Sequence, residues 1–146
     1  MRKVEFEVHG CVPPRNVRPP SMWNNPTEIP RVMKLRKSAL SAIRGRKPFS
    51  KDIKLAIEIL VPRSHNKPGD LDNFIKGICD SLYKPVKSLE NENFEPNEIF
   101  RRPENEDVHP SKFEVIDDDG QIVKIHATMA VVESEDWFYS ITVEGD

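Results

Sequence analysis

The chain has 146 residues and a net charge of −2, and its length suits one domain, residues 1–146, with a core of its own. Its 37% hydrophobic content lies above the disordered range, no apolar run approaches the roughly 20 residues of a membrane span, and residues 1–10 lack the apolar stretch of a secretory signal. Cys11 and Cys79 are too few for a disulfide framework, so we expect reduced thiols in a cytoplasmic protein.

The two halves of the sequence carry opposite charge. Residues 1–54 hold 13 Lys/Arg and 4 Asp/Glu, a net charge of +9, whereas residues 55–146 hold 9 and 20, a net charge of −11. This asymmetry is typical of chains in which one part binds a polyanion. Two solvated faces of opposite sign would give the same counts, and charge alone leaves both interpretations open.

The first third of the sequence predicts a strand, a loop and a basic helix. Residues 3–9 alternate apolar and polar side chains, and residues 11–26 are rich in Pro and Asn. Thr27 is expected to cap a helix that has Pro30 in its first turn and ends at Gly45. Six basic side chains of the loop and helix are expected to contact nucleic-acid phosphates: Arg15, Arg18, Lys34, Lys37, Arg44 and Arg46.

The middle of the sequence predicts a buried strand and the most regular helix. Residues 53–61 alternate strictly, and residues 62–69 form a basic turn whose Lys67 joins the expected phosphate contacts. Residues 70–84 carry apolar side chains at positions 71, 74, 75, 78, 79 and 82, which is a complete amphipathic stripe.

The last part of the sequence predicts a long acidic loop and a β-hairpin. Residues 85–114 have little periodicity and many acidic side chains, so we expect an inserted, partly mobile loop. Residues 122–132 and 138–143 predict two strands joined as a hairpin by a turn at 133–136. The order of elements predicts an α+β fold with a small mixed sheet packed by two main helices.

Two groups of aspartates indicate a site for a metal ion. Asp70 and Asp72 begin the helix predicted over 70–84, with Lys76 one turn later, and residues 117–119 are three aspartates before a strand. Mg²⁺ prefers carboxylate oxygens and keeps waters and a substrate phosphate. Asp70, Asp72 and one aspartate of 117–119 could therefore hold the ion, while Lys76 orients water or stabilises charge during phosphodiester hydrolysis.

Each of these features also has an ordinary structural interpretation. Aspartates are common at helix N-termini, and Asp72 with Lys76 makes a simple i, i+4 ion pair. The sequence Asp-Asp-Asp-Gly at 117–120 fits a surface turn. A metal site and a set of unrelated structural roles both remain open from the residues alone.

The residues around the aspartates resemble those of the RusA family of Holliday junction resolvases. The run Asp70-Leu-Asp72-Asn73-Phe-Ile-Lys76, continuing to Asp80 and Leu82, resembles the helix motif of that family. Asp118-Asp119-Gly120-Gln121-Ile122 looks like its second motif. Residues 85–114 stand where the family has a short turn, so the resemblance implies a RusA-like fold with a long acidic insertion.

The resemblance implies a homodimeric, Mg²⁺-dependent endodeoxyribonuclease that resolves Holliday junctions in DNA repair and recombination, with Mn²⁺ as a substitute ion. By position, the essential acids and metal ligands of the family fall on Asp70, Asp72 and Asp119, and its essential lysine falls on Lys76. Asp80 and Asn73 match as supporting residues. The expected partners are four-way or branched DNA and a second copy of the chain. The alternative is a catalytically silent junction-binding or protein-interaction module on the same fold.

Overall fold

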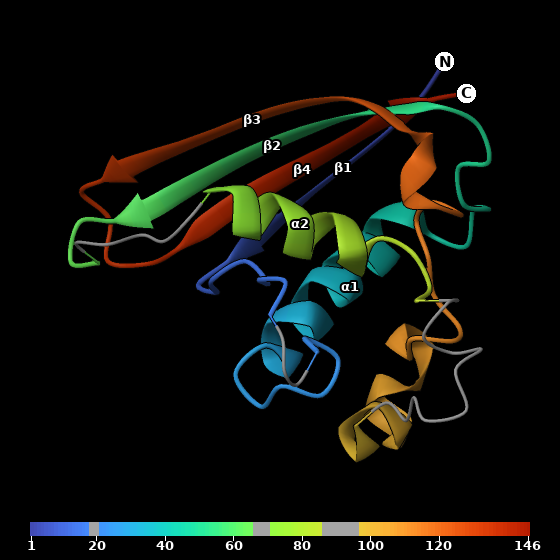
Figure 1. The fold of residues 1–146 in the computed structure, drawn as a ribbon, viewed down its shortest axis with the longest axis horizontal. Coiled ribbons are helices and arrows are strands. Elements are labelled where there is room, and N and C mark those ends of the chain that lie inside the picture. Colours follow the sequence, from blue (N-terminus) through green and yellow to red (C-terminus); the bar gives the residue numbers. More distant parts are fainter. Residues whose placement is uncertain (18–20, 66–70, 86–96) are drawn as a thin grey trace.

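A computed structural model describes residues 1–17, 21–65, 71–85 and 97–146 of the chain. A four-stranded mixed sheet carries two main helices on one face (Figure 1). The strands are β1 (Arg2–His9), β2 (Ile53–Pro62), β3 (Ile122–Val132) and β4 (Phe138–Gly145), and the helices are α1 (Ile29–Ile43) and α2 (Leu71–Ser81). The predicted α+β class, with its small mixed sheet and two main helices, is confirmed.

The predicted hairpin between the last two strands is wrong. The strand order is β1-β4-β2-β3, so β2 lies between β3, to which it is parallel, and β4, to which it is antiparallel. After β3 the chain crosses the end of β2, where the amide of Arg63 donates to the carbonyl of Val132 at 3.1 Å. Alternating apolar and polar residues locate the strands in a sequence but do not show which strands pair. This is why the predicted hairpin is wrong.

Alternate side chains of the inner strands build the core. In β2 the buried residues are Ile53, Leu55, Ile57, Ile59 and Val61. They belong to one apolar cluster with side chains of β1, β4, α1 and α2. Because β3 forms an edge of the sheet, its side chains are all half-buried or exposed.

The side chain of Asn25, and not that of Thr27, binds backbone amides at the start of α1. The N-cap residue is Glu28, and the side-chain oxygen of Asn25 accepts from the amides of Thr27 and Glu28 at 2.9 and 3.3 Å. Thr27 is therefore not the cap. An N-cap side chain at 27 would accept from the amides of residues 29 and 30, but the Ile29 amide already donates to the Asn25 carbonyl at 2.9 Å and Pro30 has no N–H. Pro30 lies in the first turn as predicted, and the helix ends at Ile43, followed by the C-cap residue Arg44, whose φ is 49°.

The prediction of a long, partly mobile loop over 85–114 is wrong for residues 98–108, which form short helices. Residues Glu98–Arg101 form the short 3₁₀ helix η1, and Pro103–Val108 form η2. Phe100 and Val108 are buried in a second apolar cluster with Trp23 and Val32. Such short helices have three residues per turn and leave no 3.6-residue periodicity in a sequence. Residues 86–96 lie outside the described residues.

Arg36 joins this segment to both helices. Its fully buried guanidinium donates to the carbonyls of Ser81 (3.0 Å), Tyr83 (3.3 Å), Val108 (3.0 Å), His109 (3.1 Å) and Phe113. Burial lowers the pKa of Arg36 to about 9, against a smaller opposing effect of Glu114. A guanidinium has five N–H donors in a rigid plane, so it can satisfy several carbonyls that one ammonium group could not.

Candidate functional site

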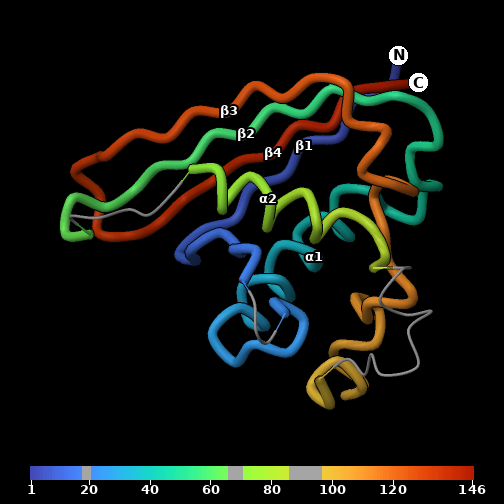
Figure 2. Tube along the Cα trace, viewed as in Figure 1, coloured from blue at the N-terminus to red at the C-terminus, as the bar shows by residue number. Residues whose placement is uncertain are grey.

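Main-chain hydrogen bonds bring the 117–119 aspartates to the C-terminal end of α2. The amides of Val115 and Ile116 donate to the Leu82 carbonyl at 2.6 and 3.1 Å, and the Phe49 amide donates to the Val115 carbonyl at 2.8 Å. The chain then forms a third 3₁₀ helix, η3 (Asp119–Gln121), and enters β3 (Figure 2). The aspartates therefore lie beside the last turn of α2, and not beside its first turn.

Gln121 fixes the conformation of this aspartate turn. Its side-chain oxygen accepts from the amides of Asp117 and Asp118, both at 2.7 Å. Its side-chain nitrogen donates to the carbonyls of Phe49 and Lys51 at 2.7 and 2.8 Å. One side chain thus ties the turn to the loop that precedes β2.

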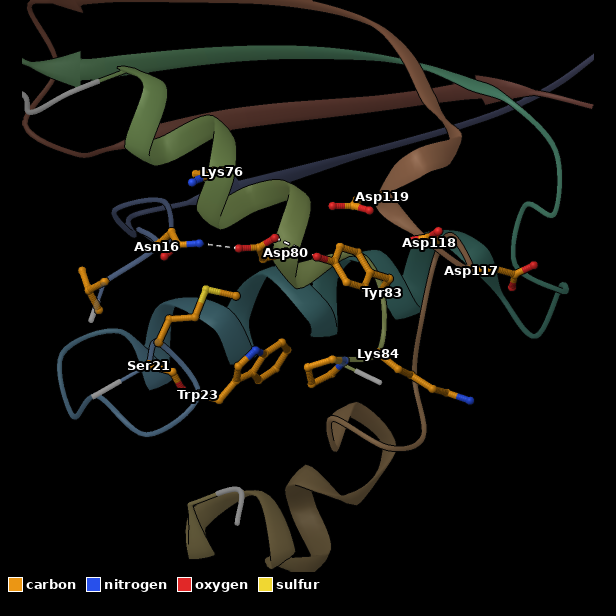
Figure 3. Close-up of a pocket in the computed structure, with 13 residues that line it drawn as sticks. Asn16, Ser21, Trp23, Lys76, Asp80, Tyr83, Lys84, Asp117, Asp118 and Asp119 are labelled. Carbon is orange, nitrogen blue, oxygen red and sulfur yellow. Dashed lines mark hydrogen bonds between the residues drawn. The ribbon is translucent and has the colours of Figure 1, made fainter. Parts of the chain in front are cut away.

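A pocket of about 550 Å³ lies between α2, the aspartate turn and the loop before α1 (Figure 3). Lys76 and Asp80 reach it from one face of α2, and Asp119 points toward α2 from η3. The other lining residues are Asn16, Val17, Ser21, Met22, Trp23, Tyr83, Lys84, Pro85, Asp117 and Asp118. The pocket therefore combines an acidic side with an apolar and aromatic side.

Asp80 is held on both carboxylate oxygens. The side-chain amide of Asn16 donates to one oxygen at 2.7 Å, and the Tyr83 hydroxyl donates to the other at 2.9 Å (Figure 3). Burial, followed by the charge of Asp80 and its hydrogen bond, raises the pKa of Tyr83 well above its usual value. Asp119 and Asp118 add to this increase, so the phenol stays protonated and remains a donor to Asp80.

The same negative charges act on Cys79. Burial, then Asp80 and Asp119, raise the pKa of the Cys79 thiol to about 12. Cys11 is also a free thiol, and its pKa is raised mainly by burial. Neither cysteine is in a disulfide, as the sequence predicted, and neither has the lowered pKa of a nucleophilic cysteine.

A close backbone contact positions Asn16 against α2. A Cβ atom on Gly77 would lie 2.1 Å from the Pro14 carbonyl oxygen, so only glycine allows the loop to approach the helix this closely. The loop is further held by the Arg15 amide, which donates to Glu28 at 2.7 Å, and by the Arg15 guanidinium, which lies 4.7 Å from the centre of the Phe74 ring. These contacts bring Asn16 to Asp80.

Two of the four predicted catalytic residues, Lys76 and Asp119, line this pocket. Asp72 is exposed one turn before Lys76 and is not among the lining residues. Asp70 lies outside the described residues. Within the part of the chain that the structure describes, no three His, Cys, Asp or Glu side chains are grouped to hold a metal ion, and the Mg²⁺ site stays a prediction.

None of the predicted phosphate contacts that the structure describes lines the aspartate pocket. Lys34 and Lys37 line an open groove along α1, and Lys37 donates to Asn105 at 2.9 Å. Arg44 and Arg46 are exposed just beyond α1. Arg15 contacts Phe74 as described above, and Arg18 and Lys67 lie outside the described residues. Their contact with DNA stays a prediction.

Sequence reasoning missed Asn16 and Tyr83 as partners of Asp80. Tyr83 follows Asp80 by three residues, and this spacing on a predicted helix was a usable signal. Asn16 is 64 residues from Asp80, and nothing in the local sequence links the two. Only the fold, through the contact at Gly77, brings them together.

Neither a protein-family model nor a curated protein matches this chain. Among the described residues, no helix has the length and apolar character needed to cross a membrane. Any functional conclusion therefore depends on the chemistry of the pocket and on the two aspartate motifs.

Proposed function

We propose that this protein is a Mg²⁺-dependent endodeoxyribonuclease that cuts four-way or branched DNA, like the RusA-family resolvases that its motifs resemble. The observation that supports this most is the meeting of Lys76, Asp80 and Asp119 in one pocket, although the helix and the turn that carry them are far apart in the sequence. Carboxylates beside an ammonium group are the side chains that metal-assisted phosphodiester hydrolysis uses.

The donor atoms of the pocket fit Mg²⁺ in kind. This ion takes oxygen ligands and needs only one or two carboxylates besides water and phosphate. Asp119 would hold it, and Asp80 beside it would support that ligand. The motif implies Asp70 and Asp72 as further ligands, but Asp72 lies two turns of α2 before Asp80, about 12 Å along the helix, and would not reach the same ion within one subunit. When bound, the ion would polarise the phosphate and lower the pKa of a bound water.

The side chains of the chain itself would then have distinct tasks. Asn16 and Tyr83 would fix the orientation of the Asp80 carboxylate, because each donates to a different oxygen. Lys76, one turn before Asp80, would bind a phosphate oxygen and offset charge that develops there. Without cations, the aspartates would repel DNA, so we expect binding of the scissile strand at the pocket to require metal.

The wider proposal includes the partners and the cellular site. Lys34, Lys37, Arg44 and Arg46 would contact phosphates away from the scissile bond. Cutting two symmetric strands requires two related sites, so the active form would be a homodimer. The protein would act in the cytoplasm, where its thiols stay reduced.

Nicking of a labelled four-way junction in Mg²⁺ tests the proposal. We expect paired nicks that chelation abolishes, and a loss of about 100-fold or more in rate for Asp119→Asn and Lys76→Met. Asp80→Asn should lose roughly 10- to 100-fold if Asp80 supports the ligands. Asp136→Asn is the matched control, since Asp136 is exposed in the connection between β3 and β4.

Two results would point elsewhere. Salt-dependent junction binding without cleavage in Mg²⁺ or Mn²⁺ would favour the catalytically silent module. Cleavage that survives Asp119→Asn at the wild-type rate would remove the pocket from the reaction.

A further inference from the structure

The pocket beside the aspartate turn has more room than phosphodiester hydrolysis uses. Its volume of about 550 Å³ lies in the range of sites that enclose a whole small molecule. A metal ion, water and one phosphate group would occupy only the acidic side with Lys76. The rest, which we call the apolar side, is lined by Val17, Met22, Trp23, Tyr83 and Pro85. This side therefore has room for a second, apolar group of the substrate.

Aromatic rings dominate the apolar side. Met22 and Trp23 are buried and form its inner wall, where the Trp23 ring packs against the ring of Phe100 with 5.9 Å between the ring centres. Val17 and Tyr83 are half-buried, so part of each side chain is open to a ligand. Flat rings stack on aromatic side chains, and every nucleobase has a flat π face whatever its identity. The apolar side therefore suits a nucleobase in kind.

Tyr83 connects the two sides of the pocket. Its hydroxyl donates to Asp80 at 2.9 Å, so the ring is held in one orientation. In the view of Figure 3 the ring lies between Asp119 and Trp23. A side chain that is already ordered loses little conformational entropy when a ligand stacks on it. Tyr83 is therefore a preorganised stacking surface beside the acidic side.

A stacked, base-paired strand could not fill the apolar side. Inside a duplex each base is enclosed by its neighbours, and enzymes that bind a single base take it out of the stack. The cost of doing so is smallest where pairing or stacking is already disturbed. Branched DNA interrupts the stack at its crossover, so a base is extruded more readily there than in a continuous duplex.

We propose that the apolar side of the pocket receives one extruded nucleobase, from the nucleotide next to the phosphate that lies at the acidic side. The base would stack on the Tyr83 ring, with Trp23 beneath it, while the phosphate lies near Lys76 and Asp119. The pocket would then select DNA at positions where a base can leave the stack, which phosphate contacts alone could not do. The base-binding role stands on the pocket itself, whereas its place beside a cut phosphate rests on the proposed function.

Nuclear magnetic resonance with a mononucleotide tests the pocket without any cleavage. Of the two tryptophans, Trp23 lines the pocket, whereas Trp137 packs against His65 and Phe74 and is not among the described residues that line it. In Mg²⁺, dAMP should shift the indole N–H signal of Trp23 and leave that of Trp137 in place. Deoxyribose phosphate, which lacks the base, should shift the Trp23 signal much less. Equal shifts with both compounds, or no shift with either at millimolar concentration, would overturn the proposal.

An abasic junction tests the same pocket during the reaction. We expect nicking to be about 10- to 100-fold slower when the nucleotide next to the cut phosphate lacks its base. Tyr83→Leu should abolish this preference for the intact junction, whereas Tyr83→Phe, which keeps the ring, should retain it. Both variants lose the hydrogen bond to Asp80, so the ratio of the rates on the two junctions isolates stacking from the positioning of Asp80. A Tyr83→Leu variant that keeps the full preference would remove Tyr83 from base binding.

The two tests separate failure of this proposal from failure of the proposed function. Equal nicking of intact and abasic junctions by the wild type would refute the base pocket and leave the endonuclease standing. If neither junction is nicked while dAMP shifts the Trp23 signal, the endonuclease fails and the base pocket stands.

Discussion

Two side chains, Arg36 and Gln121, each hold remote backbone segments together, but they do so in opposite surroundings. Arg36 is fully buried and satisfies carbonyls at the end of α2 and in residues 108–113. Gln121 is half-buried and joins the aspartate turn to the loop before β2. Water can replace a lost hydrogen bond at Gln121 but not at Arg36. Buried hydrogen bonds therefore anchor the segment that carries Tyr83 into the pocket, while the aspartate turn is held by hydrogen bonds that water can replace.

Loss of Arg36 should have the largest effect on stability. We expect Arg36→Leu to lower the free energy of unfolding by about 3–5 kcal/mol, because several buried carbonyls lose their donor. Arg36→Lys keeps the charge but offers only a compact ammonium group, so it should recover little of the loss. Urea unfolding measures both variants, with Lys34→Met as an exposed control on the same helix. A loss below 1 kcal/mol for Arg36→Leu would show that this anchor is dispensable.

Gly77→Ala tests the close backbone contact between α2 and the loop that precedes α1. The added Cβ would meet the Pro14 carbonyl and the Arg15 nitrogen, so we expect a loss of about 1–3 kcal/mol despite the better helix propensity of alanine. Gly120→Ala is the control, because its Cβ would come no closer than 3.4 Å to the Asp118 side chain. Equal stability of the two variants in thermal unfolding would contradict the close contact.

Gln121→Met should have a smaller effect on stability than Arg36→Leu or Gly77→Ala. Four hydrogen bonds are lost, but most of their partners lie at the surface, so we expect about 1–2 kcal/mol. The amides of Asp117 and Asp118 should lose protection from hydrogen exchange, while the amide of Ile78 in α2 should not. Unchanged exchange at 117 and 118 would show that the turn holds its shape without Gln121.

The smallest expected effect is a pH dependence in residues 97–114. Burial, followed by Lys112, Arg101 and Arg36, lowers the pKa of His109 below 6.5. The unfolded chain therefore binds the proton more readily, so stability should fall as the pH decreases below about 6.5 and reach its lower level beneath the folded pKa. His109→Asn should flatten this slope in urea unfolding at several pH values.

Glu106 provides the control for that experiment. A hydrogen bond and the charge of Lys112 lower the pKa of Glu106, so its contribution is present above about 4.5 and is lost in more acidic solution. Glu106→Gln should therefore change the profile only below the window of His109. An unchanged slope between pH 6.5 and 5 in His109→Asn would mean that another group is responsible.

The sequence could predict where the strands lie but not how they pair. Strict alternation marks β2, because burial with a period of two residues is a local property. The position of β4 between β1 and β2 depends on contacts between residues far apart in the chain. The 3₁₀ helices η1 and η2 could not be predicted for a different reason. Their buried residues Phe100 and Val108 pack in a cluster whose other buried members lie at 22–33, so they form no local pattern.

The candidate site, like the fold, could be predicted only in part from the sequence. Lys76 and Asp119 follow from motifs with fixed spacing, and both line the pocket. Arg36 could have been recognised as buried, since it is four residues after Val32 and three before Ala39, both on the buried side of α1. The position of Asp119 beside the end of α2 could not have been predicted, because it depends on the main-chain hydrogen bonds from residues 115 and 116 to Leu82.

The order of the strands has a consequence for how the protein is made. β1 has its described pairing only with β4, so it is synthesised well before residues 138–145 and waits for them before its backbone is paired. Contacts across such a long stretch of chain slow folding, and the waiting strand is exposed to proteases and chaperones. A stop codon before residue 138 would therefore be expected to destroy the sheet, although both aspartate motifs would still be translated.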